Sequence, residues 1–204
     1  MRARLLDAAL ECIVEFGYAS TTVTRVGERA GVSRGAQVHH FPTKVALTSA
    51  TIERLTTRFA EAAQSDTDPE PSLDAREDIL EMLWRLHREP LFLAIVELWT
   101  ASRTDAQLAA QMRAAGPLID AAILAAALDR FARARQRVDG PDEGGPLGKD
   151  AVRIAMTAVR GLVIEGFGLP PDQVESRWLP TRRLLCRYLD DAGPAVPEPS
   201  QHQP

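Results

Sequence analysis

A chain of 204 residues is long enough for one compact domain, or for a small domain joined to a larger one. Hydrophobic residues make up 45% of the chain, which predicts a sizeable core. No apolar run approaches the roughly 18 residues that span a bilayer, and acidic residues interrupt the first helix where a signal peptide would be apolar. Cys12 and Cys186 lie far apart without metal-ligand spacing, so we expect reduced thiols in a cytoplasmic protein.

The formal net charge of −4 hides an uneven distribution of charged residues. Residues 1–60 carry 8 Lys and Arg against 5 Asp and Glu, a local charge of +3, and the remainder carries 16 against 23, a local charge of −7. Exposed charges more than about 10 Å apart are screened by salt, so a basic N-terminal part can attract a polyanion despite the acidic remainder. The asymmetry is modest, and it agrees with nucleic-acid binding.

Two amphipathic helices are predicted in the first 60 residues. In the first, apolar residues recur every three or four positions, and Gly17 is expected to end the helix as a C-terminal cap. The apolar positions of this helix are Leu6, Ala9, Leu10, Ile13 and Phe16. The other helix follows Pro42 with Thr43 as its cap, and its apolar face holds Val45, Ile52, Leu55 and Phe59.

Between these helices the chain has the spacing of a helix-turn-helix. Gly27 supplies the small residue where a second helix crosses the first, and four positions later Gly31 tolerates the positive φ of the turn. Val32 then plugs the core between the helices, and Val26 and Ala30 complete the buried face of the first. Thr22 and Ser33 are the expected N-caps of the two helices. Such a unit presents its second helix to the DNA major groove.

The remainder of the chain continues with helical periodicity. Expected helices cover the region around residues 79–86, the segment beginning at Pro90, Thr104 to Arg137, Lys149 to Gly168 with an end at Gly166 or Gly168, and Pro180 to Asp191. Thr104 with Gln107 has the pattern of a capping box, and Pro117 is expected to kink or divide its helix. Residues 65–72 read as a linker and residues 139–148 as a loop. No strand alternation is seen, so the predicted fold class is all-α.

Residues 3–59 resemble the N-terminal domain of the tetracycline-repressor (TetR) family. The matching residues are Gly17, Thr22, Ala30, Gly31, Val32, Ser33, Gly35, His40, Phe41, Pro42 and Lys44. The resemblance implies a TetR-type helix-turn-helix domain over residues 1–59 and a helical regulatory and dimerisation domain over 60–192. Residues 193–204, rich in proline and polar residues, are expected to form a disordered tail. The resemblance also implies a dimeric repressor that binds a palindromic operator and is released by a small-molecule ligand.

Residue chemistry assigns expected DNA contacts within this domain. Arg34 can donate to guanine or grip a phosphate, and Gln37 can pair with adenine, while Lys44 is placed to hold a phosphate at a helix N-terminus. Arg29 is expected to stay solvated. The full set of expected contacts is Thr22, Thr24, Arg25, Ser33, Arg34, Gly35, Gln37, Val38, His39, His40 and Lys44.

Gln37 and Val38 depart from the family pattern. Related sequences usually have Leu-Tyr here, with the Leu buried and the Tyr on DNA. Either Gln37 faces DNA while Val38 packs inside, or Val38 meets a thymine methyl. We favour the first arrangement, because burying an unpaired amide costs about 1–3 kcal/mol.

The later helices are expected to sense a ligand and to dimerise. Aromatic and Met residues in the middle helices are candidates for lining a pocket, although core packing is the commoner role of such residues. These candidates are Trp84, Phe92, Trp99, Met112 and Leu118. The resemblance implies that the last two helices pair with those of a second copy. Candidate interface residues, equally suited to an internal core, are Ile154, Ala158, Gly161, Leu162 and Glu165.

Other function classes fit the sequence poorly. His39 and His40 lack a third metal ligand at helical spacing, so no metal is expected. The segment from Gly145 to Lys149 suggests a phosphate loop but has Glu143 at the position of the first glycine and no Ser or Thr after the lysine. No catalytic arrangement or cofactor is therefore expected. The remaining alternative is a helical ligand-binding or scaffold protein that no longer reads DNA.

Overall fold

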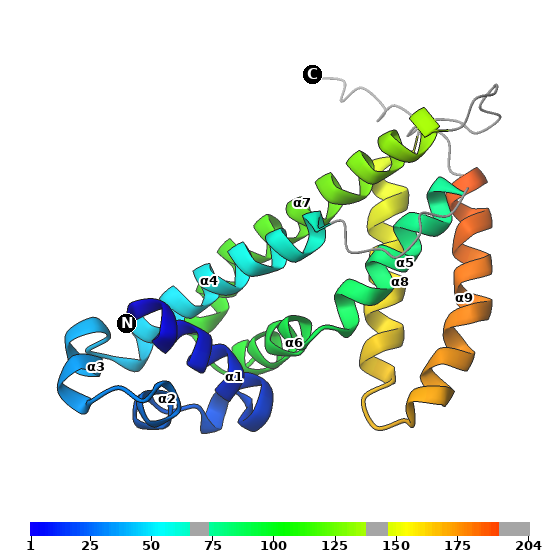
Figure 1. Ribbon diagram of the computed structural model, residues 1–204. Coiled ribbons are helices and arrows are strands. Elements are labelled where there is room, and N and C mark those ends of the chain that lie inside the picture. The colour runs from blue at the N-terminus through cyan, green and yellow to red at the C-terminus, as the bar shows by residue number, and fades with distance from the viewer. Residues whose placement is uncertain (66–73, 138–146, 192–204) are drawn as a thin grey trace, which may run out of the picture. The chain divides into compact units, whose positions relative to one another are not determined.

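A computed structural model describes residues 1–65, 74–137 and 147–191 of the protein. These residues form helices joined by short turns, and no strand occurs among them, which confirms the all-α prediction (Figure 1). The helices are α1 (Arg2–Ser20), α2 (Val23–Ala30), α3 (Arg34–His40), α4 (Lys44–Gln64), α5 (Ala75–Arg88), α6 (Pro90–Ser102), α7 (Ala106–Arg137), α8 (Lys149–Glu165) and α9 (Pro171–Asp191). No helix in the described ranges is both long enough and apolar enough to span a membrane.

The chain divides into two compact units. The first contains Met1–Asp66 and Leu86–Ile123, and the second contains Thr67–Arg85 and Leu124–Pro204. Helices α5 and α7 therefore each contribute residues to both units. By their contacts, α6 and the first half of α7 belong with the N-terminal helices. The predicted boundary at residue 59 separates a DNA-binding domain from a regulatory domain, and it stays a prediction.

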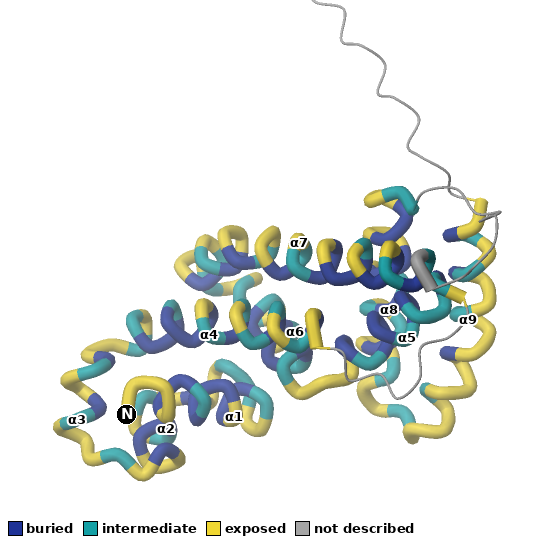
Figure 2. Tube along the Cα trace, turned by 45° about the horizontal axis from the view of Figure 1, so that its top comes forward, coloured by how far each residue is buried: buried dark blue, intermediate teal, exposed yellow. Residues whose placement is uncertain are grey.

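The core of the first unit forms around α1, which packs against α2, α4 and α6. The predicted apolar stripe of α1 is buried at Leu6, Ala9, Leu10 and Ile13 (Figure 2). Phe16 is the exception, because it lies at the surface beneath the guanidinium of Arg25. The buried cluster that joins α1 to the following helices consists of Leu5, Leu6, Ala8, Ala9, Cys12, Val26, Ala30, Phe41, Leu47 and Ala50.

Polar bonds add to this core at helix ends and between helices. Gly17 has a φ of 75°, which interrupts α1 near the predicted position, although helical turns resume as far as Ser20. Arg4 of α1 donates from Nη2 to the Ala30 carbonyl at 2.5 Å and so satisfies the end of α2. Asp7 Oδ1 on α1 forms an ion pair with Arg54 Nε on α4 at a distance of 3.1 Å, and this pair links the two helices.

The second unit is held by an aromatic stack and by ion pairs. The rings of Trp84 and Trp178 stack with centroids 4.6 Å apart and an interplanar angle of 6°. Glu81 accepts hydrogen bonds from Trp178 Nε1 at 3.3 Å and from Arg182. Arg182 also pairs with Glu77 at 3.1 Å. These contacts join α5 to α9, while α8 packs against α9.

Some predicted helix boundaries differ from the structure, and the start of α9 differs most. The cap of α7 is Asp105, whose carboxylate accepts from the backbone N–H groups of the next turn, rather than Thr104. Pro117 does not divide α7. Helix α8 ends at Glu165 with Gly166 as its C-cap, in agreement with one of the two expected ends, whereas α9 begins at Pro171 with Pro180 inside it. Proline at residue 171 suits the first turn of a helix, where its missing N–H has no intrahelical partner. The linker, loop and tail predictions lie outside the described residues, apart from their edges at Ser65, Leu147 and Gly148.

Candidate nucleic-acid interface

Helices α2 and α3 form the predicted helix-turn-helix. Gly31 closes α2 in the left-handed region with φ 61° and ψ 41°, a conformation that costs other residues energy. The Val32 N–H then donates to the Gly27 carbonyl at 3.0 Å, and Val32 packs against the core of the first unit. The predicted roles of Gly31 and Val32 are confirmed.

Side chains cap both helices as the sequence predicts. The Thr22 hydroxyl accepts from the Arg25 N–H at 3.2 Å, and the Ser33 hydroxyl accepts from the Ala36 N–H at 3.4 Å. Each cap satisfies one of the free N–H groups that begin a helix. The start of α3 is therefore set by Ser33, and its end by Phe41, whose side chain is buried in the core. Together these two residues orient α3.

Gly27 is the point at which α3 crosses α2. A Cβ atom added at Gly27 would lie 2.5 Å from Oε1 and 2.8 Å from Cδ of Gln37. The missing side chain of Gly27 thus makes room for the Gln37 amide. The prediction of a small residue at this crossing is confirmed.

The favoured orientation of Gln37 and Val38 is wrong. Gln37 is only 4% exposed, whereas Val38 is 49% exposed. The physical reason is the anchoring of α3 at Ser33 and Phe41, which turns position 37 toward Gly27 and position 38 outward. Gln37 Nε2 is buried without a hydrogen-bond partner, so the folded protein carries the free-energy cost of an unsatisfied amide. Gln37 is accordingly removed from the set of expected DNA contacts.

The outward face of α3 combines a cation, an apolar side chain and a bare backbone. Arg34, Val38 and His39 are exposed, and Gly35 would have nothing within 4 Å of an added Cβ. His40 is half-buried, with its ring centroid 5.4 Å from that of His39. Ser33, Thr22 and Thr24 are exposed beside this face. The structure therefore brings most of the expected contacts to the surface of one unit.

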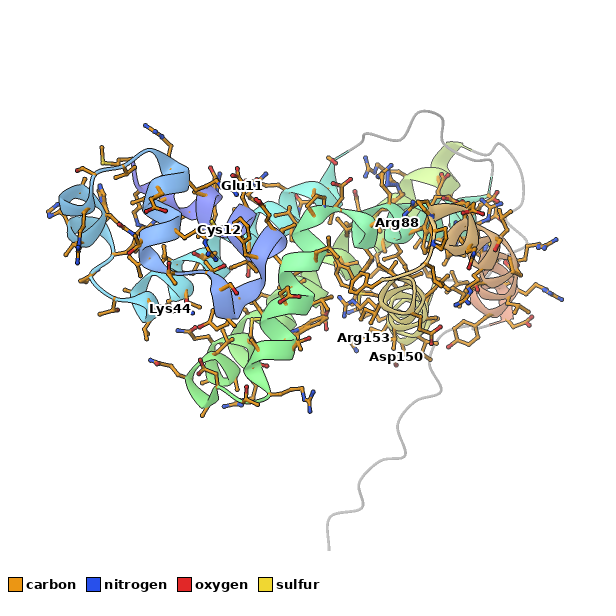
Figure 3. All side chains as sticks on the ribbon, turned by 90° about the horizontal axis from the view of Figure 1, so that it is seen from below. Glu11, Cys12, Lys44, Arg88, Asp150 and Arg153 are labelled. Carbon is orange, nitrogen blue, oxygen red and sulfur yellow. The ribbon has the colours of Figure 1, made fainter. Side chains whose placement is uncertain are left out.

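Arg25 and Arg29 differ in their surroundings. Arg25 lies over the Phe16 ring at 4.7 Å and donates to the Ser20 carbonyl. Arg29 pairs with Glu15 and, at 3.5 Å, with Glu11, both on α1 (Glu11 is labelled in Figure 3). The hydrogen bond to Glu15 raises the pKa of the Arg29 guanidinium above its ordinary value. Two neighbouring carboxylates make Arg29 a poor phosphate ligand, in agreement with leaving it out of the contact set.

Lys44 begins α4 and contacts α1 (Figure 3). Its Nζ donates to the Tyr18 carbonyl at 3.3 Å and lies 4.4 Å from the centre of the Tyr18 ring. The Thr43 hydroxyl caps the same helix by accepting from the Ala46 N–H at 3.1 Å, as predicted. Lys44 thus places a positive charge at a helix N-terminus, which is the arrangement that attracts phosphate.

The five candidate ligand-binding residues have different surroundings. Phe92 and Met112 are buried and Trp99 is half-buried, with the Phe92 and Trp99 rings 6.4 Å apart. Trp84 belongs to the second unit, where it stacks on Trp178. Leu118, which is 62% exposed, is the member that lines a hollow.

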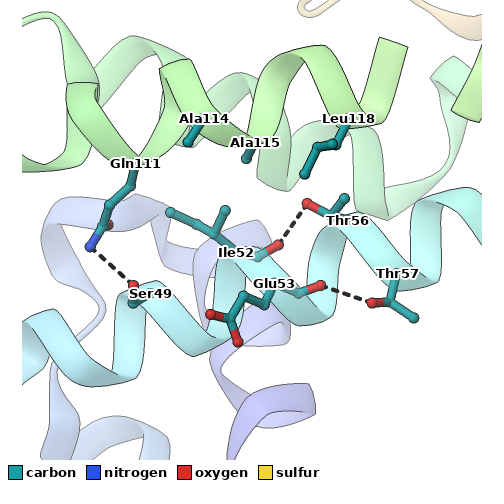
Figure 4. A pocket seen from close by; sticks show the side chains of 9 residues that line it. All are labelled: Ser49, Ile52, Glu53, Thr56, Thr57, Gln111, Ala114, Ala115 and Leu118. Carbon is teal, nitrogen blue, oxygen red and sulfur yellow. Dashed lines mark hydrogen bonds between the residues drawn. The ribbon is translucent and has the colours of Figure 1, made fainter. Parts of the chain in front are cut away.

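That hollow lies between α4 and the first half of α7 and measures about 430 Å³ (Figure 4). Its lining residues are Ser49, Ile52, Glu53, Thr56, Thr57, Gln111, Ala114, Ala115 and Leu118. Gln111 Nε2 donates to Ser49 Oγ at 3.4 Å across one end. The sequence contained one signal of this surface: Ser49 and Thr56 lie at helical spacing from Ile52, so polar residues interrupt the predicted apolar face of α4.

The five candidate dimer residues lie on the outer side of α8. Ile154 is 51% exposed, Gly161 and Glu165 are exposed, and Ala158 and Leu162 are half-buried. The internal face of α8 is formed by other residues, namely Ala151, Val152, Ala155, Met156, Val159 and Val163. Further exposed apolar side chains of the second unit are Ile164, Phe167, Leu179 and Leu184.

Within the described ranges, no three His, Cys, Asp or Glu residues are grouped closely enough to hold a metal ion.

The capped α2–α3 pair defines the class of protein, a helix-turn-helix DNA-binding regulator. Residues 5–51 match the model of bacterial regulatory proteins of the tetR family. The repressor AcnR of Corynebacterium efficiens is 30% identical over 142 residues, covering 70% of this chain and 72% of AcnR. The chain therefore belongs to the TetR family of transcriptional regulators, and it is not an enzyme.

Two further comparisons show where similarity is concentrated. CymR of Pseudomonas putida is 45% identical over 64 residues, which are 31% of this chain and 32% of CymR. The chain thus matches only about a third of CymR. A solved structure concerning the control of antibiotic production by bacterial hormones is 26% identical, with a TM-score of 0.66, and covers 92% of this chain and 96% of that one. Sequence similarity is therefore strongest at the N-terminus, while the fold is shared more widely.

Proposed function

We propose that the protein is a dimeric repressor that binds a palindromic operator and is released by a small-molecule ligand. One observation carries the proposal: a capped helix-turn-helix exposes Arg34, Val38 and His39 on the same short helix. A helix of this kind presents a few side chains to base edges in the major groove.

Arg34 is the leading candidate for a base contact. Its side chain is exposed and forms no hydrogen bond or ion pair with the residues that the structure describes. A free guanidinium on a recognition helix suits bidentate donation to guanine O6 and N7. His39 can donate to a neighbouring base edge or to a backbone oxygen.

The flanking polar residues suit contacts to the DNA backbone. Thr22 and Thr24 lie at the start of α2, and Lys44 lies at the start of α4. Lys44 would exchange its contact with the Tyr18 carbonyl for a phosphate oxygen. Arg25 would reach a phosphate only by leaving the Phe16 ring, so its expected contribution is smaller than that of Arg34.

Dimerisation is supported by the exposed apolar side chains on α8. A single helix-turn-helix neutralises few phosphates, so two copies reading two half-sites bind far more tightly than one. Ile154→Glu would place a charge in the proposed interface and should give monomers in analytical ultracentrifugation. Ile154→Val, which keeps an apolar surface, should stay dimeric. Dimers of the Glu variant at all concentrations would contradict this interface.

The hollow between α4 and α7 is the proposed site of the effector. Its volume of about 430 Å³ falls in the range of small-molecule sites. Ile52 and Leu118 offer apolar surface, and Gln111 and Glu53 offer polar groups, which together suit an amphipathic molecule. Because α4 is continuous from Lys44, a ligand that moves this helix would change the position of the reading head.

Thermal-shift measurements over a metabolite panel would find such a ligand, and operator release would show that it acts. Ala114→Trp should fill the hollow and abolish both effects. Ala110→Trp, exposed one turn earlier and outside the hollow, is the matched control. Ligand binding that survives Ala114→Trp unchanged would place the effector elsewhere.

The central experiment is selection of bound sites from a random DNA pool, followed by affinity measurements at two salt concentrations. Arg34→Ala should lose about 1–3 kcal/mol at one base position per half-site. Arg29→Ala removes the same charge from an ion-paired position and should leave sequence selectivity unchanged. Lys44→Ala should weaken binding to all sequences alike. Equal affinity for selected and random DNA would instead favour a ligand-binding or scaffold protein that does not read DNA.

A further inference from the structure

Val38 is an apolar side chain exposed in the centre of the surface that faces DNA in the proposed function. It is 49% exposed, because Gln37 occupies the inward position against Gly27. Arg34 lies one helical turn before it, and Gly35 leaves the backbone bare beside it.

The chemistry of Val38 restricts what it can recognise. Its two methyl groups neither donate nor accept hydrogen bonds, so contact with a polar base edge would only strip water from that edge. The apolar group that the common bases present in the major groove is the C5-methyl of thymine. Placing Val38 against that methyl would remove apolar surface from water on both sides.

We propose that Val38 reads a thymine in each half-site by packing against its C5-methyl group. The inference rests on the proposed function and adds a specificity determinant to it. Arg34 and Val38 are four residues apart on α3, a rise of about 6 Å, and base pairs are spaced about 3.4 Å apart. The thymine therefore lies within one or two base pairs of the base that Arg34 contacts.

Operator duplexes in which single thymines are replaced by deoxyuridine test the proposal directly. Deoxyuridine keeps the base pair and removes only the methyl group. Loss of one buried methyl contact should weaken binding of the unaltered protein about 3–5-fold at one position per half-site. Changing that T·A pair to C·G should also weaken binding, and 5-methylcytosine at the same position should restore part of the loss.

Variants of Val38 connect the thymine methyl to this residue. Val38→Ala should abolish the deoxyuridine effect at that position while leaving effects at other positions unchanged. Val38→Thr, which has nearly the same shape but replaces one methyl by a hydroxyl, should retain a reduced effect. Val45→Ala alters an exposed valine on α4 and should retain the full effect. Circular dichroism would verify that each variant is folded.

The outcomes separate this inference from the proposed function. Selective operator binding without a deoxyuridine effect at any thymine, or with an effect that Val38→Ala leaves intact, would overturn the role of Val38 alone. Selected half-sites that contain no thymine would do the same. Absence of any sequence selectivity would overturn the proposed function, and the inference with it.

Discussion

Replacing Gln37 by an apolar residue should stabilise the protein. Gln37 is 4% exposed, and its Nε2 has no hydrogen-bond partner. A buried polar group without a partner costs about 1–3 kcal/mol, and an apolar side chain of similar size avoids that cost. We therefore expect Gln37→Leu and Gln37→Met to raise the free energy of unfolding by about 1–3 kcal/mol. For a chain of this length, each kcal/mol corresponds to about 2–4 °C in Tm.

Two variants are needed because the amide lies against Gly27. Leucine is branched and is the residue usual at this position in related sequences, whereas methionine has an unbranched side chain like that of glutamine. Thermal unfolding by circular dichroism measures the change in Tm. Hydrogen exchange at the Gly31 and Val32 amides reports whether the gain arises in the α2–α3 unit. Gln107→Leu changes an exposed glutamine on α7, elsewhere in the first unit, and should alter stability by less than about 0.5 kcal/mol.

A lower Tm for both Gln37 variants would refute the reasoning, because it would mean that the amide contributes net favourable interactions. Unchanged exchange at the turn combined with a higher Tm would place the gain outside this unit. Operator binding provides a second readout. Since Gln37 faces inward, both variants should keep the sequence preference of the unaltered protein.

Three further predictions concern the turn, a thiol and the second unit. Gly31→Ala should lower the free energy of unfolding by about 1–2 kcal/mol, because the φ of Gly31 is 61°, and Gly31→Asn should lower it less. Equal losses for the two variants would show that the left-handed backbone conformation is not the cause. Burial raises the pKa of the Cys186 thiol from its ordinary 9.0 to about 11. As pH rises, the thiol of the unfolded chain therefore loses its proton first, so the free energy of unfolding should fall between about pH 9 and about pH 11. Denaturant unfolding at several pH values measures this change, and Cys186→Ser should remove it. Trp178→Ala should cost about 3–5 kcal/mol by breaking the stack with Trp84, whereas a loss below 1 kcal/mol would show that the stack contributes little.

Local sequence determined the helices and turn of the N-terminal region. Gly31 in the left-handed region, together with Thr22, Ser33 and Thr43 as caps, followed from the backbone preferences and hydrogen-bonding reach of single residues. These are short-range effects that need no knowledge of the rest of the molecule. The same reasoning failed at Thr104, because Asp105 offers an equally local cap one residue later.

Tertiary structure alone decided the orientation of side chains on α3 and the location of the hollow. Positions 37 and 38 are adjacent on a helix of 7 residues, so periodicity could not tell which one faces inward. The choice depends on the burial of Phe41 in the core and on the space that Gly27 leaves for Gln37. Both are set by packing between helices. The hollow likewise requires α7 to lie against α4, about 60 residues away in sequence, with Gln111 reaching Ser49. Which of two neighbouring positions is buried, and where two helices leave a hollow, depends on packing between helices that local preferences do not encode.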